Sequence, residues 1–106
     1  MRRELSEGHC SPPSEAALRA MVLAQRARDA AMARAMRAAG PEAILIAGNG
    51  HVRKDRGVPA LLPGTVSLGL IELKESRSDA AEYLAAPYDY LWFTAQVPRP
   101  DPCAPR

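Results

Sequence analysis

The sequence has few large side chains with which to build a core. Among 106 residues there are one Phe, one Trp and three Tyr, although apolar residues make up 47%. A domain of this size folds alone only if it buries about two-thirds of the surface of its unfolded chain. We therefore expect a thin core, in either an oligomer or a piece of a larger protein. The candidates for that core are Leu18, Met21, Val22, Ile44, Leu45, Ile46, Val66, Leu68, Leu70, Ile71, Leu91, Trp92 and Phe93.

A block of like charge and a long apolar run are also missing. Fourteen Lys and Arg face twelve Asp and Glu, and the basic residues are scattered, so we expect no nucleic-acid partner. The longest apolar stretches, residues 43–48 and 91–93, are far shorter than the roughly 18 to 20 residues of a membrane span. Polar residues follow residues 1–3 where a signal peptide has its apolar core. The sequence therefore indicates neither a signal peptide nor a transmembrane segment in this chain.

One long helix is predicted over residues 15–39. This run lacks Gly and Pro, Ser14 is a natural N-cap, and Gly40 followed by Pro41 predicts the end. One stripe of the helix recurs at three- and four-residue steps: Leu18, Met21, Val22, Gln25, Asp29, Met32 and Met36. A buried carboxylate needs a partner, so at Gln25 and Asp29 the helix either is partly solvated or lines a polar site.

Three strands are predicted after the helix. Residues 43–47 are continuously apolar, which is typical of a strand buried on both faces of a parallel sheet. Residues 65–73 alternate, and residues 88–94 are rich in aromatic side chains. Residues 59–62 and 80–86 predict short helical turns. The predicted fold is α/β, an incomplete mixed or parallel sheet of about three strands with one long helix packed on it. We divide the chain into an N-terminal arm (1–13), a partial α/β domain (14–97) and a Pro-rich tail (98–106).

His51 is the strongest candidate for chemistry. It follows the first predicted strand in a turn with two glycines, and ligands of open parallel sheets bind beyond the carboxyl ends of strands. Imidazole suits metal ligation and proton transfer, although an ordinary loop histidine is the alternative. The basic residues that follow suit an anionic ligand or form a solvated charged turn. The ligand-binding residues that we expect around one cleft are Gln25, Arg28, Asp29, Asn49 and His51, with Arg53 or Arg56 at its rim.

Other candidate ligands are few. His9 stands beside Cys10, but no spaced Cys or His motif supports a zinc site. Tyr83, Tyr88 and Tyr90 could each bind ferric iron as a phenolate, or serve as ordinary strand aromatics. Cys10 and Cys103 would be bridged in an exported protein and free in a cytosolic one, and their positions do not choose between these. Nucleophile elbows, phosphate-binding loops and dinucleotide fingerprints are absent from the sequence.

Five motifs between residues 7 and 103 form an ordered set. They are Glu7-Gly8-His9-Cys10, Gln25-x-x-Arg28-Asp29-x-x-Met32-Ala33, Gly48-Asn49-Gly50-His51-Val52-Arg53, Asp55-Arg56-Gly57-Val58-Pro59 and Asp101-Pro102-Cys103. This set resembles the C-terminal part of the ChaN-like haem-binding uptake family, which is similar to the Tiki/TraB and erythromycin-esterase groups. The resemblance implies that the family's N-terminal half has no counterpart in this chain, so that the missing half or a second copy would cover its apolar face.

The resemblance also implies a function and a location. It implies a haem-binding protein of bacterial iron uptake, periplasmic or outer-membrane-associated, in a family whose members are often lipid-anchored. Haem is the implied cofactor, with a divalent metal as an alternative held by His51 and His9. The other readings are a metal- or His-dependent hydrolase of the Tiki or erythromycin-esterase type with His51 as ligand or base, and an inactive structural remnant. An exported location would join Cys10 to Cys103 in a disulfide.

Overall fold

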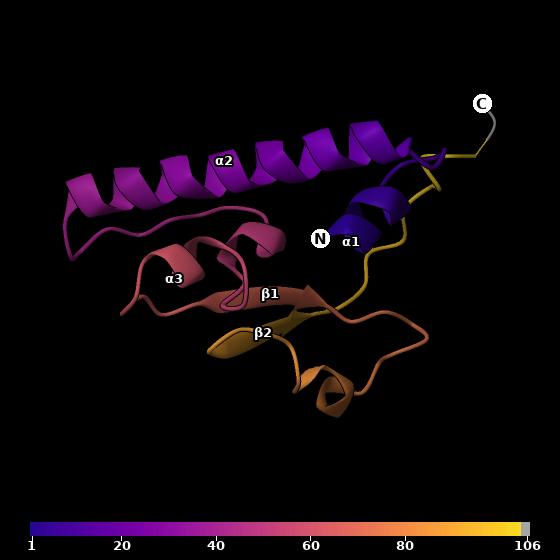
Figure 1. The fold of residues 1–106 in the computed structure, drawn as a ribbon. Helices are drawn as coiled ribbons and strands as arrows, with labels where there is room; N and C mark the ends of the chain where they lie inside the picture. The colour runs from indigo at the N-terminus through magenta and orange to yellow at the C-terminus, as the bar shows by residue number, and fades with distance from the viewer. Residues whose placement is uncertain (105–106) are drawn as a thin grey trace.

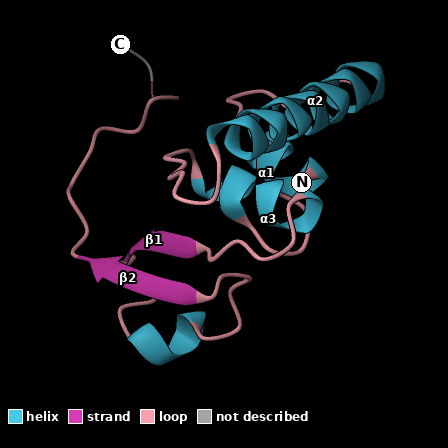
Figure 2. Cartoon of the chain, turned by 90° about the vertical axis from the view of Figure 1, so that its left-hand side faces the viewer, coloured by secondary structure: helices cyan, strands magenta, loops and turns pink. Residues whose placement is uncertain are grey.

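The computed structural model describes residues 1–104 as one long helix beside a small parallel sheet. Helix α2 (Glu15–Ala39) lies over β1 (Leu68–Glu72) and β2 (Tyr90–Thr94) (Figure 1). The shorter elements are helices α1 (Arg2–Glu7) and α3 (Val58–Leu61) and the 3-10 turns η1 (Asn49–Val52) and η2 (Ala80–Tyr83). The three α-helices gather on one side of the sheet (Figure 2). The predicted α/β class, with one long helix and an incomplete sheet, is confirmed.

Helix α2 has the boundaries that its sequence predicts. The Ser14 hydroxyl oxygen accepts a hydrogen bond from the Ala17 N–H at 3.1 Å, which caps the first turn. Gly40 ends the helix with φ of +95°, where its N–H donates to the Met36 carbonyl. The predicted stripe faces the protein, with Leu18 and Asp29 buried and Met32 half-buried. The sequence was sufficient to predict both ends of α2, because Ser14 and Gly40 each act within one helical turn of the end they define.

The N-terminal arm differs from the prediction, because residues 2–7 form helix α1. Arg3 and Glu7 make an ion pair at 2.7 Å across one turn, and Leu5 is half-buried. Arg2 pairs with Glu15 at the start of α2. The first pair supports α1 itself and the second joins α1 to α2, so the arm begins with a helix that contacts α2.

The prediction of a buried strand at residues 43–47 is wrong. The segment contains neither helix nor strand, and Ile44 and Ile46 are 88% and 93% exposed. Within residues 1–104, the backbone groups of residues 44–47 make no hydrogen bond. A strand of this kind needs neighbours at both edges and cover on both faces. The part of the chain that the structure describes supplies neither. The first of the three predicted strands is therefore unpaired.

The two remaining strands pair in parallel, with Leu68 opposite Tyr90 and Leu70 opposite Trp92. These four side chains share one face of the sheet and are 46% to 65% exposed. Six of the thirteen predicted core residues are therefore wrong in this structure, because Ile44, Ile46, Val66, Leu68, Leu70 and Trp92 are exposed; of the other seven, Leu18 is buried and six are half-buried. The fully buried apolar residues among residues 1–104 are Leu18, Ala33 and Val58. The core is thin, as predicted.

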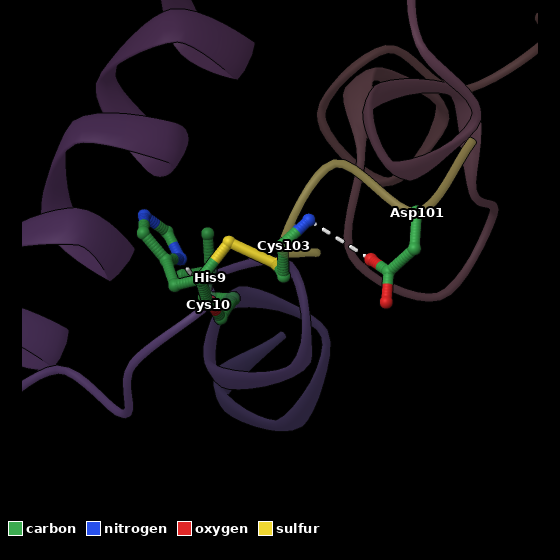
Figure 3. The surroundings of a disulfide bond; sticks show 5 residues. His9, Cys10, Asp101 and Cys103 are labelled. Atoms are coloured by element: carbon green, nitrogen blue, oxygen red, sulfur yellow. Dashed lines mark hydrogen bonds between the residues drawn. A yellow bond between two sulfur atoms is a disulfide. The ribbon is translucent and has the colours of Figure 1, made fainter. Parts of the chain in front are cut away.

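A disulfide joins Cys10, which follows α1, to Cys103 near the C-terminus (Figure 3). The two Cα atoms are 5.4 Å apart, and 93 positions separate the cysteines in sequence. The Cys103 N–H donates to the Asp101 carboxylate at 2.9 Å, which fixes the end of the loop. Residues 98–104 of the predicted tail contain no helix or strand, and residues 105–106 of that tail lie outside the described residues.

We predict that reducing this disulfide strongly destabilises the protein. Closing a loop of this length contributes about 4 to 5 kcal/mol in the chain-entropy treatment, which is large beside a thin core. Urea unfolding of oxidised protein and of Cys10→Ser/Cys103→Ser protein measures the difference. Equal stability of the two forms, or two alkylatable thiols in protein from an oxidising compartment, would contradict the prediction.

Candidate functional site

A buried carboxylate and a half-buried imidazole meet where α2 passes the η1 turn. The His51 Nδ1 lies 2.6 Å from the Asp29 Oδ1. The Asp29 side chain is 3% exposed and the His51 side chain 24% exposed. The pair accounts for the polar interruption of the α2 stripe, because Asp29 receives its partner from an element 22 residues away. Since Nδ1 is used by the carboxylate, Nε2 is the ring atom that can act on a ligand.

The turn that carries His51 is held from the sheet side. The Asn49 side chain donates to the Leu70 carbonyl at 2.7 Å and accepts from the Leu70 N–H at 3.3 Å, so it substitutes for a strand at this edge of β1. The Tyr88 hydroxyl donates to the Asn49 carbonyl at 3.2 Å, and burial raises the pKa of that hydroxyl, which keeps it a donor. The Ser67 hydroxyl donates to the Val52 carbonyl. The turn is thus fixed on both sides of His51.

Gly57 is the glycine that this turn requires. A Cβ atom at residue 57 would overlap the carbonyl group of His51, and would lie 2.9 Å from the Arg53 carbonyl oxygen. A Cβ atom at Gly50 would meet nothing within 4 Å, and one at Gly48 would touch only the His51 ring edge at 3.9 Å. The close approach therefore occurs within the protein, six residues after His51, rather than at the two glycines that precede it.

The predicted residues on α2 divide into two groups. Gln25 lies one helical turn before Asp29 and is half-buried, and its Oε1 is buried without a hydrogen-bond partner among the described residues. Arg28 is exposed beside Asp29. The structure thus brings Gln25 and Asp29 to the inner face of the helix and leaves Arg28 outside.

The basic residues after His51 are paired with acids. Arg53 makes two hydrogen bonds to Asp55, at 2.9 Å and 2.6 Å, and holds the pKa of the Asp55 carboxyl below its usual value. Arg56 bonds to Glu4 of α1 at 3.1 Å. Lys54 pairs with Asp89 at 2.6 Å. The predicted cationic rim is therefore a set of ion pairs that tie the loop to α1 and to the start of β2.

The other predicted ligands lie away from His51 or serve the fold. The His9 Nδ1 lies 2.5 Å from the Leu5 carbonyl oxygen, beside the disulfide (Figure 3). The Tyr83 hydroxyl donates to the Arg77 carbonyl at 2.9 Å, while Tyr90 is 65% exposed on the sheet. Within residues 1–104 no three His, Cys, Asp or Glu side chains come together as a metal site would need. Of the two histidines, His51 is the one whose ring is oriented by a buried carboxylate.

A groove of about 800 Å³ opens beside the turn. Apolar side chains from three segments line it: residues 43–47, α3 with the loop after it, and β1. Asn49 and Val52 of the η1 turn also line the groove. Sequence reasoning missed this groove, because it exists only while residues 43–47 are unpaired. His51 itself does not line the groove, so the groove and the imidazole are neighbours only through the η1 turn that carries them both.

The family model described as "Haem-binding uptake, Tiki superfamily, ChaN" matches residues 1–62, more than half of the 106 residues. The chain belongs to this family. The match spans α1, α2, the η1 turn and α3, so it includes both residues of the Asp29–His51 pair. Neither the curated proteins nor the solved structures include a match. No helix among the described residues of this ChaN-family chain is long and apolar enough to cross a membrane.

We predict a coupling free energy of about 1.5 to 3 kcal/mol between Asp29 and His51, the range for hydrogen bonds to charged groups. Urea unfolding of Asp29→Ala, His51→Ala and the double variant gives this value as a double-mutant cycle. Arg28→Ala, on the adjacent exposed position, is the control and should change stability by less than about 0.5 kcal/mol. A coupling energy near zero would mean that the pair is not formed in solution.

We also predict that Gly57→Ala displaces the His51 turn. The added methyl group must move the His51 backbone, at a cost of about 1 to 3 kcal/mol. The matched control is Gly50→Ala, which adds the same methyl group to open space in the same turn. Unfolding free energies and the NMR signals of the His51 ring report the effect. Equal behaviour of the two variants would contradict it.

Proposed function

We propose that this ChaN-family protein binds haem with His51 as the iron ligand. The observation that carries the proposal is the 2.6 Å hydrogen bond that the His51 Nδ1–H donates to the buried Asp29 carboxylate. A carboxylate at one ring nitrogen fixes the tautomer and raises the basicity of the other nitrogen, as in metal-ligating histidines. Haem iron commonly takes one such imidazole, and it needs no cluster of protein ligands.

An apolar surface for a flat cofactor lies next to the η1 turn, in a groove that Asn49 and Val52 line and His51 does not. The groove of about 800 Å³ beside the turn falls within the roughly 300 to 1,000 Å³ of small-molecule sites and is lined mostly by apolar side chains. The haem would supply iron and its macrocycle, whereas the protein would supply the imidazole and the apolar surface.

The same pair supports a second candidate, a His-dependent hydrolase. A histidine oriented by a buried carboxylate is also the arrangement of a general base. In that case Asp29 would hold the imidazole and Nε2 would take a proton from water. The two candidates differ in what an experiment would observe. Haem binding gives a coloured protein, whereas hydrolysis gives substrate turnover by a colourless protein.

We propose that the protein works outside the cytoplasm, in the periplasm or at the outer membrane. The disulfide supports this, because such bonds persist in oxidising compartments. The family's role in haem uptake supports it too.

We predict that purified protein with an intact disulfide gives a Soret band on titration with hemin. Because His51→Ala removes the iron ligand, this variant should bind hemin at least about tenfold more weakly, a loss of about 1.4 kcal/mol in binding free energy. The chain offers a matched control in its second histidine, because His9→Ala removes an imidazole that lies beside the disulfide. Asp29→Asn should weaken binding less than His51→Ala, since the amide oxygen still accepts from Nδ1.

Three other outcomes would be informative. Equal losses in the His9 and His51 variants would indicate nonspecific hemin adsorption and contradict the proposal. Binding without dependence on His51 would assign the iron to another residue. Ester hydrolysis that depends on His51, in protein without a Soret band, would favour the second candidate.

A further inference from the structure

Two arginines of the loop after His51 approach the same carboxylate oxygen. The Oε1 atom of Glu4 in α1 lies 3.1 Å from the Arg56 guanidinium and 3.5 Å from the Arg53 guanidinium. The Arg53 and Arg56 side chains are 23% and 26% exposed, whereas the Glu4 side chain is 53% exposed. Arg53 and Arg56, here called the arginine pair, are thus the half-buried side of this contact, and the carboxylate is its exposed side.

The backbone that carries the arginine pair is fixed without Glu4. The Gly57 N–H donates to the Arg53 carbonyl at 2.9 Å, which closes one turn and brings residues 53 and 56 to neighbouring positions. The Lys54 N–H donates to the Pro87 carbonyl at 2.8 Å, so the turn is attached to the segment before β2. Two hydrogen bonds to Asp55 orient the Arg53 guanidinium. The arginine pair is therefore preorganised whether or not α1 is in place.

Glu4 satisfies the arginine pair only in part. Both arginines approach its Oε1 atom, while its Oε2 atom lies 2.7 Å from the Met1 nitrogen. Arg56 donates one side-chain hydrogen bond within residues 1–104, to Glu4, although a guanidinium has five N–H donors. A carboxylate that presents both oxygens can make the paired hydrogen bonds that guanidinium groups favour. A ligand carboxylate can therefore bind the arginine pair better than Glu4 does.

Helix α1 can leave the arginine pair at little cost to the fold. It has six residues, none of them buried, and a helix this short is not stable by itself in water. The other ion pair that joins α1 to the rest of residues 1–104 is the exposed one between Arg2 and Glu15. The disulfide at Cys10 keeps a released α1 close to its place, so that release is reversible.

We propose that Arg53 and Arg56 are a binding site for the carboxylate of a small-molecule ligand, and that Glu4 is an internal occupant that this ligand displaces. Helix α1 is then autoinhibitory, because the ligand and Glu4 compete for the same two guanidinium groups. The ligand class follows from the occupant, since a carboxylate already fits there. The site includes neither a residue of the apolar groove nor the Asp29–His51 pair, and it does not require His51 to bind iron.

The first test is titration with succinate, a simple dicarboxylate, at constant ionic strength, followed by the NMR signal of the Gly57 amide. Glu4→Gln keeps the size of the side chain and removes its charge. It should tighten succinate binding at least about threefold, because more of the arginine pair is free to bind. Arg56→Gln should weaken binding at least about tenfold.

The matched control is Glu42→Gln, which removes the same charge from an exposed residue. Glu42 follows the C-terminal end of α2, whereas α1 pairs with Glu15 at the other end of that helix (Figure 1). This variant should bind succinate as the wild-type protein does. Circular dichroism should show all the variants folded, since none of the replaced side chains is buried.

Hydrogen exchange tests whether the ligand displaces α1. The Gly8 N–H donates to the Glu4 carbonyl at 2.9 Å, so its exchange rate reports whether α1 is formed. Saturating succinate should speed this exchange at least about threefold in the wild-type protein, and should have no effect in Arg56→Gln protein.

Hemin and hemin dimethyl ester then identify the source of the carboxylate. The ester has the same iron and macrocycle without free carboxylates. Faster Gly8 exchange with hemin, but not with the ester, assigns the arginine pair to the carboxylates of the cofactor. Faster exchange with succinate alone assigns it to a separate small acid.

Equal succinate affinity of the Glu4→Gln and Glu42→Gln proteins would overturn the proposal, as would Gly8 exchange that neither succinate nor hemin changes. Glu4 would then be a structural ion-pair partner only. A Soret band that depends on His51 in the same protein would leave the proposed function standing. Succinate binding to the arginine pair of a protein that gives no Soret band would contradict the haem proposal alone.

Discussion

The buried carboxylate of Asp29 is the constraint around which this chain is arranged. It lies in the middle of a 25-residue helix, on the face turned toward the rest of the protein, where an unpaired charge would cost several kcal/mol. The η1 turn satisfies it by delivering the His51 ring. Because the helix fixes the position of Asp29, the turn has to come to the helix, and residues 43–47 are laid out between the end of α2 and that meeting point (Figure 1).

The sheet then fixes the turn from its other side. Asn49 closes one edge of β1 at Leu70, Tyr88 holds the Asn49 carbonyl, and Ser67 holds the Val52 carbonyl. These bonds join residues that are 15 to 39 positions apart. Asp29 on α2 thus holds the His51 ring, while β1 and the residues before β1 and β2 hold the turn that carries it. Such preorganisation is what an iron ligand or a general base needs.

Some parts of this arrangement could be predicted from the sequence and others could not. Helix α2 could be predicted to the residue, since Ser14 and Gly40 act within one turn of the positions they limit. Asp29 and His51 could be predicted as partners, because a carboxylate on an apolar stripe requires one. Gly57, Ser67 and Tyr88 could not be found, since their roles depend on contacts across long stretches of chain that no local pattern records. Residues 43–47 were wrongly predicted to be a buried strand. An apolar run shows that a segment would be stabilised by burial, but it does not show whether neighbouring strands are present to bury it.

The polar contacts around His51 are thus satisfied within the chain, whereas many of the apolar side chains of this molecule are not buried. Hydrogen bonds are directional, so one carboxylate, one amide and two hydroxyls suffice to fix the His51 turn. Apolar burial scales with area, and this chain leaves eleven of its large aliphatic and aromatic side chains exposed. The disulfide compensates through the unfolded state, and its roughly 4 to 5 kcal/mol is comparable with the whole stability of a marginal domain of about 5 kcal/mol. The geometry around His51 therefore depends on a bond that forms only under oxidising conditions. The site and the compartment in which it can exist are thus linked through Cys10 and Cys103.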